Sequence, residues 1–162
     1  MAFDYKISGV SGKQEKYRHV LEQLEAIIAH ESNLIANMAN ICAVLKTEFG
    51  WFWIGFYLTD TPEELVLGPF QGPLACTRIA KGKGVCGTAW QQAATIVVPD
   101  VAQFPGHIAC SALSRSEIVV PLMVNGEVAA VLDADSELYD TFDDTDAHFL
   151  EKLLEKLADR IK

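Results

Sequence analysis

The dipeptide Asn125-Gly126 constrains the fold of this chain more than any other feature of its sequence. It separates two runs that are rich in β-branched and other apolar residues, 116–124 and 127–136. Asn and Gly readily adopt the positive φ angles of a two-residue turn, so the pattern predicts a β-hairpin. Each strand of this hairpin is expected to be about as long as the run that forms it.

A second hairpin is expected in the first half of the chain. The run 51–58 is rich in aromatic residues, and the run 64–70 is largely apolar, as is typical of strands. Residues 59–62 lie between them and have the composition of a turn. Two hairpins indicate an antiparallel sheet with helices packed on it.

Apolar residues at spacings of three and four predict amphipathic helices at both ends of the chain. The middle is rich in Gly and Pro and is expected to be mostly loop, with one short helix and one buried strand. The expected helices are 13–30, 34–45, 85–92 and the segment from about 143 to the end, with a strand at 95–98 and a long connection at 99–114. This order predicts a single α+β domain that spans residues 1–162.

The charge of the chain argues against a polyanionic partner. Its formal net charge is −9, and its Lys and Arg residues form no cluster, so we expect no nucleic acid to bind. No apolar run approaches the ~20 residues of a membrane-spanning helix, and the N-terminus lacks a secretory signal pattern. We therefore expect a cytoplasmic protein without a membrane partner. In that compartment a disulfide is more often transient and catalytic than structural.

The cysteines of the chain fall into two groups. Cys42 lies on the apolar side of the predicted second helix, and we interpret it as a small core residue. The other three lie among glycines and prolines, where loops are expected: Cys76, Cys86 and Cys110. His107 and Arg115 flank Cys110, and Cys86 comes near the start of the short helix. Because nearby cations and helix N-termini favour thiolates, this grouping favours a thiol redox site.

Two other kinds of site match parts of the same region. Residues 82–87 have the G-x-G-x-x-G spacing of a dinucleotide-binding loop, but neither a buried parallel strand nor a long helix adjoins them. A zinc site could use Cys76, Cys86, His107 and Cys110, although the paired C-x2-C spacing of most zinc sites is absent. We favour the redox site over both and expect no metal.

Three acids lie in the predicted C-terminal hairpin. Strand alternation places Glu117 on the same face as Val119, and it places Asp133 and Asp135 together on one face of their strand. A carboxylate is costly to bury unless it is paired or protonated. These acids are therefore either solvated residues at a sheet edge or, in a pocket, groups with raised pKa values that can donate protons.

Several segments resemble the free methionine-(R)-sulfoxide reductases, which are small stand-alone enzymes with a GAF fold. The similarity extends from Trp53 to the final helix and includes the run Phe-Pro-Gly-His-Ile-Ala-Cys at 104–110. The other matching segments are 67–72, 75–79, 82–89, 98–101, 116–121 and 131–136. The resemblance implies a GAF-like antiparallel sheet with packed helices and the reduction of free L-methionine-(R)-sulfoxide to L-methionine.

The resemblance also implies roles for individual residues. Cys110 corresponds to the catalytic thiol and Cys76 to the resolving thiol, which together would form a redox disulfide. Cys86 corresponds to a third family cysteine that is either an alternative resolver or has another role. Acids would hold the sulfoxide and amino groups of the substrate, and an aromatic wall its methyl group: Glu117, Asp133, Asp135 and Trp53. One of Glu117, Asp133 and Asp135 would donate a proton in the reaction.

The implied reaction needs no bound cofactor. The electrons would come from thioredoxin, and indirectly from NADPH, through reduction of the disulfide. A homodimer is a candidate assembly that the sequence does not decide. The alternative from another functional class is a non-catalytic GAF sensor that binds a small ligand or signals by thiol oxidation.

Overall fold

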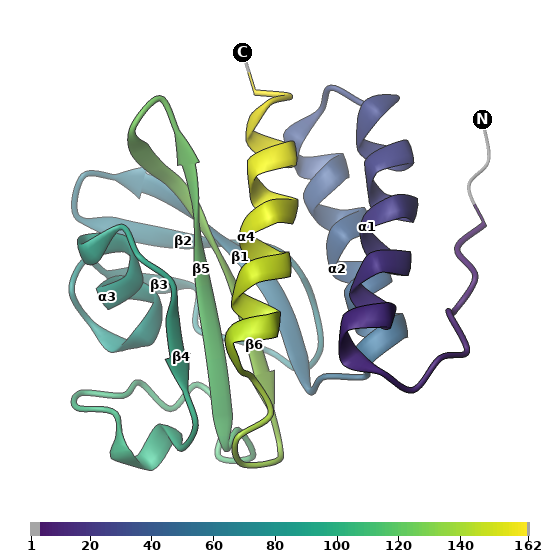
Figure 1. The fold of residues 1–162 in the computed structure, drawn as a ribbon. Helices are drawn as coiled ribbons and strands as arrows, with labels where there is room; N and C mark the ends of the chain where they lie inside the picture. The colour runs from purple at the N-terminus through teal and green to yellow at the C-terminus, as the bar shows by residue number, and fades with distance from the viewer. Residues whose placement is uncertain (1–3, 162) are drawn as a thin grey trace.

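The computed structural model describes residues 4–161, which form helices and strands in the predicted order (Figure 1). No helix in this range is long and apolar enough to cross a membrane. The elements are α1 (Lys13–Ala29), α2 (Leu34–Phe49), β1 (Trp53–Thr61), β2 (Glu64–Gln71), β3 (Arg78–Ala80), α3 (Gly84–Gln92), β4 (Ile96–Val98), the 3-10 turn η1 (Val101–Gln103), β5 (Ser116–Val124), β6 (Glu127–Ser136) and α4 (Asp144–Ala158).

The six strands form one sheet in the order β3-β2-β1-β6-β5-β4, and every neighbouring pair is antiparallel. The β5–β6 hairpin turns at Asn125 and Gly126, whose φ angles are 53° and 80°. Positive φ at both positions is what a two-residue hairpin turn requires. Because β6 also pairs with β1, this hairpin lies in the middle of the sheet. The α+β class and the antiparallel sheet are confirmed.

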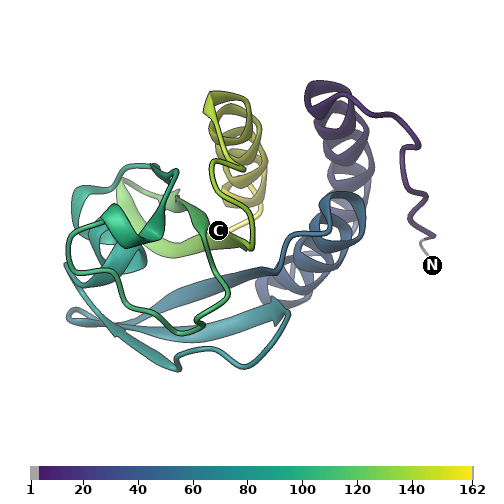
Figure 2. The ribbon, with the colours of Figure 1, turned by 90° about the horizontal axis from the view of Figure 1, so that it is seen from below.

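The two faces of the sheet carry separate apolar clusters. Helices α1, α2 and α4 cover one face, where they pack against alternate strand residues such as Phe56 and Leu132. Helix α3 covers the other face and packs against residues such as Tyr57 and Val119. Figure 2 shows the sheet curling around α3, with the three longer helices on the outside of the curl. The loops that carry Cys76 and Cys110 belong to the α3 side.

The first strand and the edge strands differ from the sequence expectation. Strand β1 begins at Trp53, because Trp51 stacks on Phe49 with ring centroids 4.6 Å apart and joins the helical cluster instead. The sequence does not predict β3, a three-residue strand in which only Ile79 is buried. Strand β4 is an edge strand, so Ile96 is only partly buried where the sequence indicates a buried strand.

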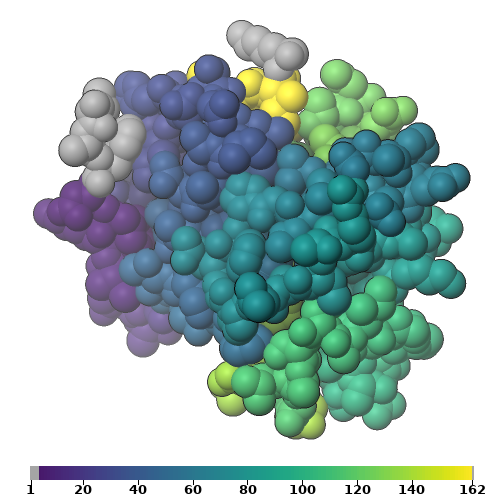
Figure 3. All heavy atoms as spheres, turned by 180° about the vertical axis from the view of Figure 1, so that it is seen from behind, coloured from purple at the N-terminus to yellow at the C-terminus, as the bar shows by residue number. Residues whose placement is uncertain are grey.

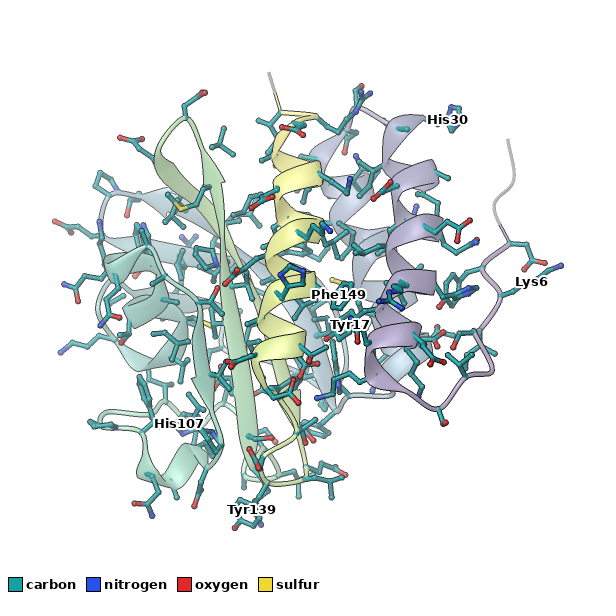
Figure 4. All side chains as sticks on the ribbon, viewed as in Figure 1. Lys6, Tyr17, His30, His107, Tyr139 and Phe149 are labelled. Atoms are coloured by element: carbon teal, nitrogen blue, oxygen red, sulfur yellow. A yellow bond between two sulfur atoms is a disulfide. The ribbon has the colours of Figure 1, made fainter. Side chains whose placement is uncertain are left out.

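Asp146 joins the start of α4 to α1. Its Oδ2 accepts hydrogen bonds from Lys13 Nζ at 2.7 Å and from the backbone N–H of Asp143 at 2.8 Å. Its Oδ1 accepts from the Tyr17 hydroxyl at 2.6 Å. The Asp143 side chain accepts in return from the Asp146 N–H, which completes a capping box. The Tyr17 ring stacks on Phe149 between the two helices (Figure 4).

We expect Asp146→Ala to lower the free energy of unfolding by about 2–4 kcal/mol, because it removes the cap and leaves the Tyr17 hydroxyl and Lys13 ammonium without this partner. Urea unfolding followed by circular dichroism measures the loss. Asp144→Ala is the matched control, since Asp144 is an exposed acid in the same helical turn and its loss should change stability by less than about 0.5 kcal/mol. Equal losses in the two variants would contradict the assigned role of Asp146.

Candidate active site

Three strands place three of the predicted site residues in one row across the sheet. Trp53 on β1 lies opposite Asp135 on β6, which lies opposite Glu117 on β5. Residues directly opposite one another on antiparallel strands project from the same face. Asp133, two positions before Asp135, projects from this face as well. All four side chains therefore lie on the α3 side of the sheet, in the arrangement that strand alternation predicts.

These side chains line a pocket of about 600 Å³, counting its open mouth. The carboxyl groups of the sheet form its floor. The Trp53 ring, stacked on Tyr57 and Phe70 with ring centroids 6.0 and 5.5 Å apart, forms an aromatic wall. The remaining walls come from residues 73–75, the start of α3 and residues 107–114. An enclosure of this size and mixed polarity suits a small molecule.

Gly55 provides the space that the Trp53 ring occupies. It lies on β1 opposite Asp133. A Cβ at position 55 would lie 2.4 Å from Trp53 Cη2 and 2.5 Å from the Cβ of Phe70, which is closer than real Cβ contacts. Any larger residue would therefore displace the aromatic wall.

Burial controls the protonation of the carboxyl groups. Glu117 and Asp133 are buried and Asp135 is partly buried. Burial, aided by repulsion from Asp135, raises the pKa of Glu117 to about 8. Burial and the neighbouring acids also raise the pKa values of Asp133 and Asp135 well above the usual range. The three acids are therefore pocket groups whose pKa values are raised, and the interpretation as solvated edge residues is wrong.

One carboxyl oxygen on the pocket floor has no partner within residues 4–161. Asp133 Oδ1 is buried without a hydrogen bond, whereas Asp135 Oδ1 accepts one from the Ser114 hydroxyl at 2.8 Å. A buried acceptor without a partner costs about 1–3 kcal/mol. Such an atom in a pocket indicates the place where a ligand donates a hydrogen bond.

Cys86 lies in the first turn of α3, in agreement with the short helix predicted for residues 85–92. It is buried in the apolar cluster on this side of the sheet. Burial raises the pKa of the Cys86 thiol well above its usual range, and repulsion from Asp133 and Glu117 adds to the effect. The environment therefore favours the protonated thiol, which is the opposite of the activation expected at a helix N-terminus.

Cys76 and Cys110 form a disulfide, and their Cα atoms are 5.6 Å apart across a sequence separation of 34. Cys76 is partly buried and Cys110 is exposed. Figure 3 shows the teal segment around residue 75 meeting the green segment around residue 110 at the surface. Cys110 also lines the pocket. The two cysteines that the resemblance pairs are thus bonded to each other at the pocket mouth.

The loop that carries Cys76 is attached to strand β1. The indole Nε1 of Trp53 donates a hydrogen bond to the carbonyl oxygen of Pro73 at 3.1 Å. The Tyr57 hydroxyl donates to the carbonyl oxygen of Cys76 at 2.9 Å. The aromatic wall of the pocket therefore also fixes the backbone at Cys76.

A tight turn directs His107 toward the pocket floor. The His107 N–H donates to the carbonyl oxygen of Phe104 at 3.2 Å, and Pro105 and Gly106, with φ 72° at the glycine, occupy the central positions. Pro followed by a residue with positive φ is typical of a type II turn. The ring Nε2 lies 3.5 Å from Glu117 Oε2, and burial lowers the pKa of His107. Figure 4 shows His107 on the loop beneath α3.

Arg115 does not direct its charge at the disulfide. Its Nη1 donates to the carbonyl oxygen of Ala112 at 3.2 Å, and its guanidinium lies over the ring of Tyr139 at 6.0 Å. The cation that the sequence places beside Cys110 is therefore engaged elsewhere on the surface.

The zinc and dinucleotide alternatives do not match the structure. Two members of the zinc set, Cys76 and Cys110, are bonded to each other and offer no thiolate. Residues 82–87 follow an antiparallel edge strand and start a helix of nine residues, whereas a dinucleotide fold needs a parallel strand. The donor atoms of Cys86, Glu117 and Asp133 lie within 4.8 Å of one another, and burial raises the pKa of each of the three groups. We assign no metal to them, and the absence of a metal stays a prediction.

Polar residues that the sequence does not single out also line the pocket, among them Tyr57, Lys83 and Ser114. Tyr57 could have been found, because its spacing of four from Trp53 places both rings on one face of a strand. Ser114 and Lys83 lie on loops, where the periodicity of strands and helices does not indicate which way a side chain points.

Residues 31–162 match the family model of the GAF domain. GAF domain-containing protein A of Dictyostelium discoideum is 57% identical over 157 residues, which cover 97% of this chain and 99% of that protein. The free methionine-R-sulfoxide reductase of Escherichia coli is 43% identical over 146 residues, 90% of this chain and 88% of that protein. The X-ray structure of the free methionine-R-sulfoxide reductase of Neisseria meningitidis in complex with its substrate is 57% identical, with a TM-score of 0.94 and coverage of 97% and 94%.

We expect the free energy of unfolding to fall as the pH rises from about 5 to 8. In this window the folded protein keeps the Glu117 proton, because the pKa is raised from 4.5 to about 8, whereas the unfolded chain has released it. A folded state that binds an extra proton loses about 1.4 kcal/mol per pH unit. Glu117→Gln should reduce the slope of the unfolding free energy against pH by this amount, as measured by urea unfolding.

The exposed Glu127 supplies the control for this titration, since Glu127→Gln removes a carboxyl group at the other end of the same hairpin. This variant should keep the slope of the unsubstituted protein. A slope that is unchanged in Glu117→Gln would show that the Glu117 carboxyl is not protonated in the folded state.

Proposed function

The chain belongs to the GAF-domain family and, within it, to the free methionine-(R)-sulfoxide reductases, and from this premise we propose how its pocket works. The protein is an oxidoreductase that reduces free methionine-(R)-sulfoxide to methionine. The observation that best supports this activity is the Cys76–Cys110 disulfide at the mouth of a pocket with a floor of buried carboxyl groups. The site thus combines a nucleophile, a second thiol and a source of protons.

Cys110 is the nucleophile of the proposed reaction. In the reduced protein its thiolate attacks the sulfoxide sulfur, and the oxygen moves to Cys110 as methionine departs. The thiolate, the sulfoxide and one proton give the Cys110 sulfenic acid and methionine. The exposure of Cys110 and its position in the pocket wall support this role.

A carboxyl group supplies that proton, because sulfoxide oxygen is a poor leaving group until it is protonated. Glu117 is the leading donor, since its raised pKa of about 8 keeps it protonated at neutral pH while leaving it able to release the proton. Asp135, directly opposite on β6, is the second candidate.

Asp133 and Trp53 hold the two ends of the substrate. The unpaired Oδ1 of Asp133 would accept a hydrogen bond from the ammonium group of a free amino acid, and the positive charge would favour ionisation of this acid. The Trp53 ring would pack against the methyl group and the sulfur, since sulfur contacts with aromatic rings are favourable.

Cys76 resolves the sulfenic acid. Its thiol condenses with Cys110–SOH to form the disulfide, and the oxygen leaves as water. The closeness of the two Cα atoms supports this pairing. Cys86 is buried and keeps its proton, so we assign it a place in the pocket wall rather than the resolving step.

An external dithiol must then reduce the disulfide in every turnover. We propose thioredoxin as this reductant, with NADPH as the indirect source of electrons, no bound cofactor and the cytoplasm as the location. We also propose that residues 1–162 act as one GAF-like domain. The homodimer stays untested.

We expect Cys110→Ser to abolish methionine formation even in a single turnover, because no nucleophile remains. Cys76→Ser should form about one methionine per chain and then stop in the presence of thioredoxin. Mass spectrometry of the protein and quantification of methionine measure both outcomes. Equal single-turnover yields in the two variants would overturn the assignment of nucleophile and resolver.

Cys86→Ser is the matched cysteine control, and it should keep repeated thioredoxin-dependent turnover. Loss of recycling in this variant, with retention of one turnover, would move the resolving role from Cys76 to Cys86.

The substrate range is tested by thioredoxin-coupled NADPH consumption with the separate R and S epimers, each supplied free and within a peptide. We expect consumption with the free R epimer alone. Oxidation of the thiols by peroxide without consumption on any of the four substrates would instead favour a GAF sensor that signals by its disulfide.

A further inference from the structure

We propose that His107 is a positioning residue that carries protons from solvent to the Glu117 carboxyl and so restores the acid after each turnover. The inference rests on the proposed function, in which Glu117 protonates the sulfoxide oxygen. It gives a task to a side chain that the reaction described above leaves unused.

The proton balance of the reaction requires such a route. Cys110 releases one proton to solvent when its thiol becomes a thiolate, and Glu117 gives another to the departing oxygen. The condensation of Cys110–SOH with the Cys76 thiol forms the disulfide and water and returns no proton to Glu117. One proton must therefore travel from solvent to the Glu117 carboxylate in every cycle.

The Glu117 carboxylate has few contacts through which a proton can reach it. It is buried, and an ionised carboxylate on the pocket floor is unfavourable until it is neutralised. The titratable groups that surround the pocket come from every element packed on it: Asp133 and Asp135 on β6, Cys86 on α3, Tyr57 on β1, Lys83 at the rim and His107 on the loop. Two of these groups contact the Glu117 carboxyl: Asp133 through a side-chain hydrogen bond, and His107, whose Nε2 lies 3.5 Å from Glu117 Oε2.

His107 joins this contact to the solvent. Its side chain is 15% exposed, compared with 7% for that of Glu117, so the imidazole lies between the buried acid and the surface. The other neighbours are engaged or enclosed: Asp133 and Cys86 are buried, and the Tyr57 hydroxyl is bonded to the Cys76 carbonyl. Asp135 is partly buried, and its Oδ1 accepts a hydrogen bond from the Ser114 hydroxyl. Lys83 is exposed but lies at the rim.

The chemistry of imidazole suits the transfer. A histidine can take up a proton at one ring nitrogen and give one from the other near neutral pH. His107 Nε2 and Glu117 Oε2 are 3.5 Å apart, slightly longer than a hydrogen bond, and such contacts often tighten when the substrate binds. Burial lowers the pKa of His107, so a protonated ring readily gives its proton to the adjacent carboxylate.

The local fold holds the ring in this position. The type II turn at Phe104–His107 fixes the backbone of His107, and the contact of Nε2 with Glu117 Oε2 places the ring over the pocket floor. The same loop carries Cys110 three residues later, so the proton carrier and the nucleophile are placed by one segment.

The test compares the first turnover with the steady state in His107→Gln, which keeps a polar side chain but cannot carry a proton. With a saturating chemical dithiol, the ratio of the steady-state rate to the first-turnover rate should fall on the order of tenfold or more relative to the unsubstituted protein. The reason is that only later turnovers need a restored acid. A purely structural role would lower both rates together and leave the ratio unchanged, which would overturn the proposal.

Chemical rescue provides a second readout. Added imidazole should restore the steady-state rate of His107→Ala, and the restoration should weaken as the pH rises and imidazolium disappears. It should not restore Glu117→Gln, which has no carboxyl group to reprotonate. His148→Gln, an exposed histidine on α4, is the control and should behave as the unsubstituted protein does, with and without imidazole.

The outcomes distinguish a failure of the proposed reductase activity from a failure of the role proposed for His107. If the unsubstituted protein forms no methionine from free methionine sulfoxide, the proposed function fails. If it turns over, but the rate ratio of His107→Gln is unchanged and imidazole has no effect on His107→Ala, the role of His107 alone is wrong. Thermal unfolding of each variant checks that it is folded before its rates are compared with those of the unsubstituted protein.

Discussion

The burial of three carboxyl groups on one face of an antiparallel sheet is the constraint on which the site depends. The strand register places Glu117 directly opposite Asp135, and two negative charges in such a pair repel each other. Helix α3 and the loops exclude water above them, and this burial raises the pKa values of both acids. The same burial keeps the proton on Cys86, whereas Cys110 stays exposed at the mouth. Burial therefore accounts both for the raised pKa values of the acids and for the difference between the enclosed thiol of Cys86 and the exposed Cys110.

The opposite face of the sheet serves stability. There Cys42 is completely buried, and burial raises its pKa to about 12, in agreement with its interpretation as a core residue. Asp146, another buried acid, is paired with Lys13 and Tyr17 and fastens α4 to α1. Buried polar groups with complete sets of partners hold a fold together, whereas the pocket keeps Asp133 incompletely bonded. The division between structural and chemical roles follows the two faces of one sheet.

Much of this architecture is encoded in local patterns. Asn125-Gly126 predicts the central hairpin because the turn needs two residues that tolerate positive φ, and the two-residue period of strands predicts the shared face of Asp133 and Asp135. The sequence predicts the short helix that carries Cys86 but not the burial of its thiol, because that burial depends on the strand residues packed against the helix. The sequence does not predict the contact of His107 with Glu117. The contact forms because the loop turns back toward β5 over the ten positions that separate them, and the spacing of apolar residues gives no information about the path of a loop.

The two loops joined by the disulfide are fastened unequally. Hydrogen bonds from Trp53 and Tyr57 hold the Cys76 backbone to β1, whereas the Cys110 N–H bonds to Ile108 within its own loop. When the disulfide is reduced, the Cys110 loop loses its covalent tie while the Cys76 loop keeps its attachment. The Cys110 loop keeps contacts of its own with the strands, since the Ser114 hydroxyl donates to Asp135 Oδ1 at 2.8 Å and His107 Nε2 lies 3.5 Å from Glu117 Oε2. Breaking the disulfide therefore leaves each loop with a separate attachment to the sheet, so the bond can open and close in every turnover without rebuilding the pocket.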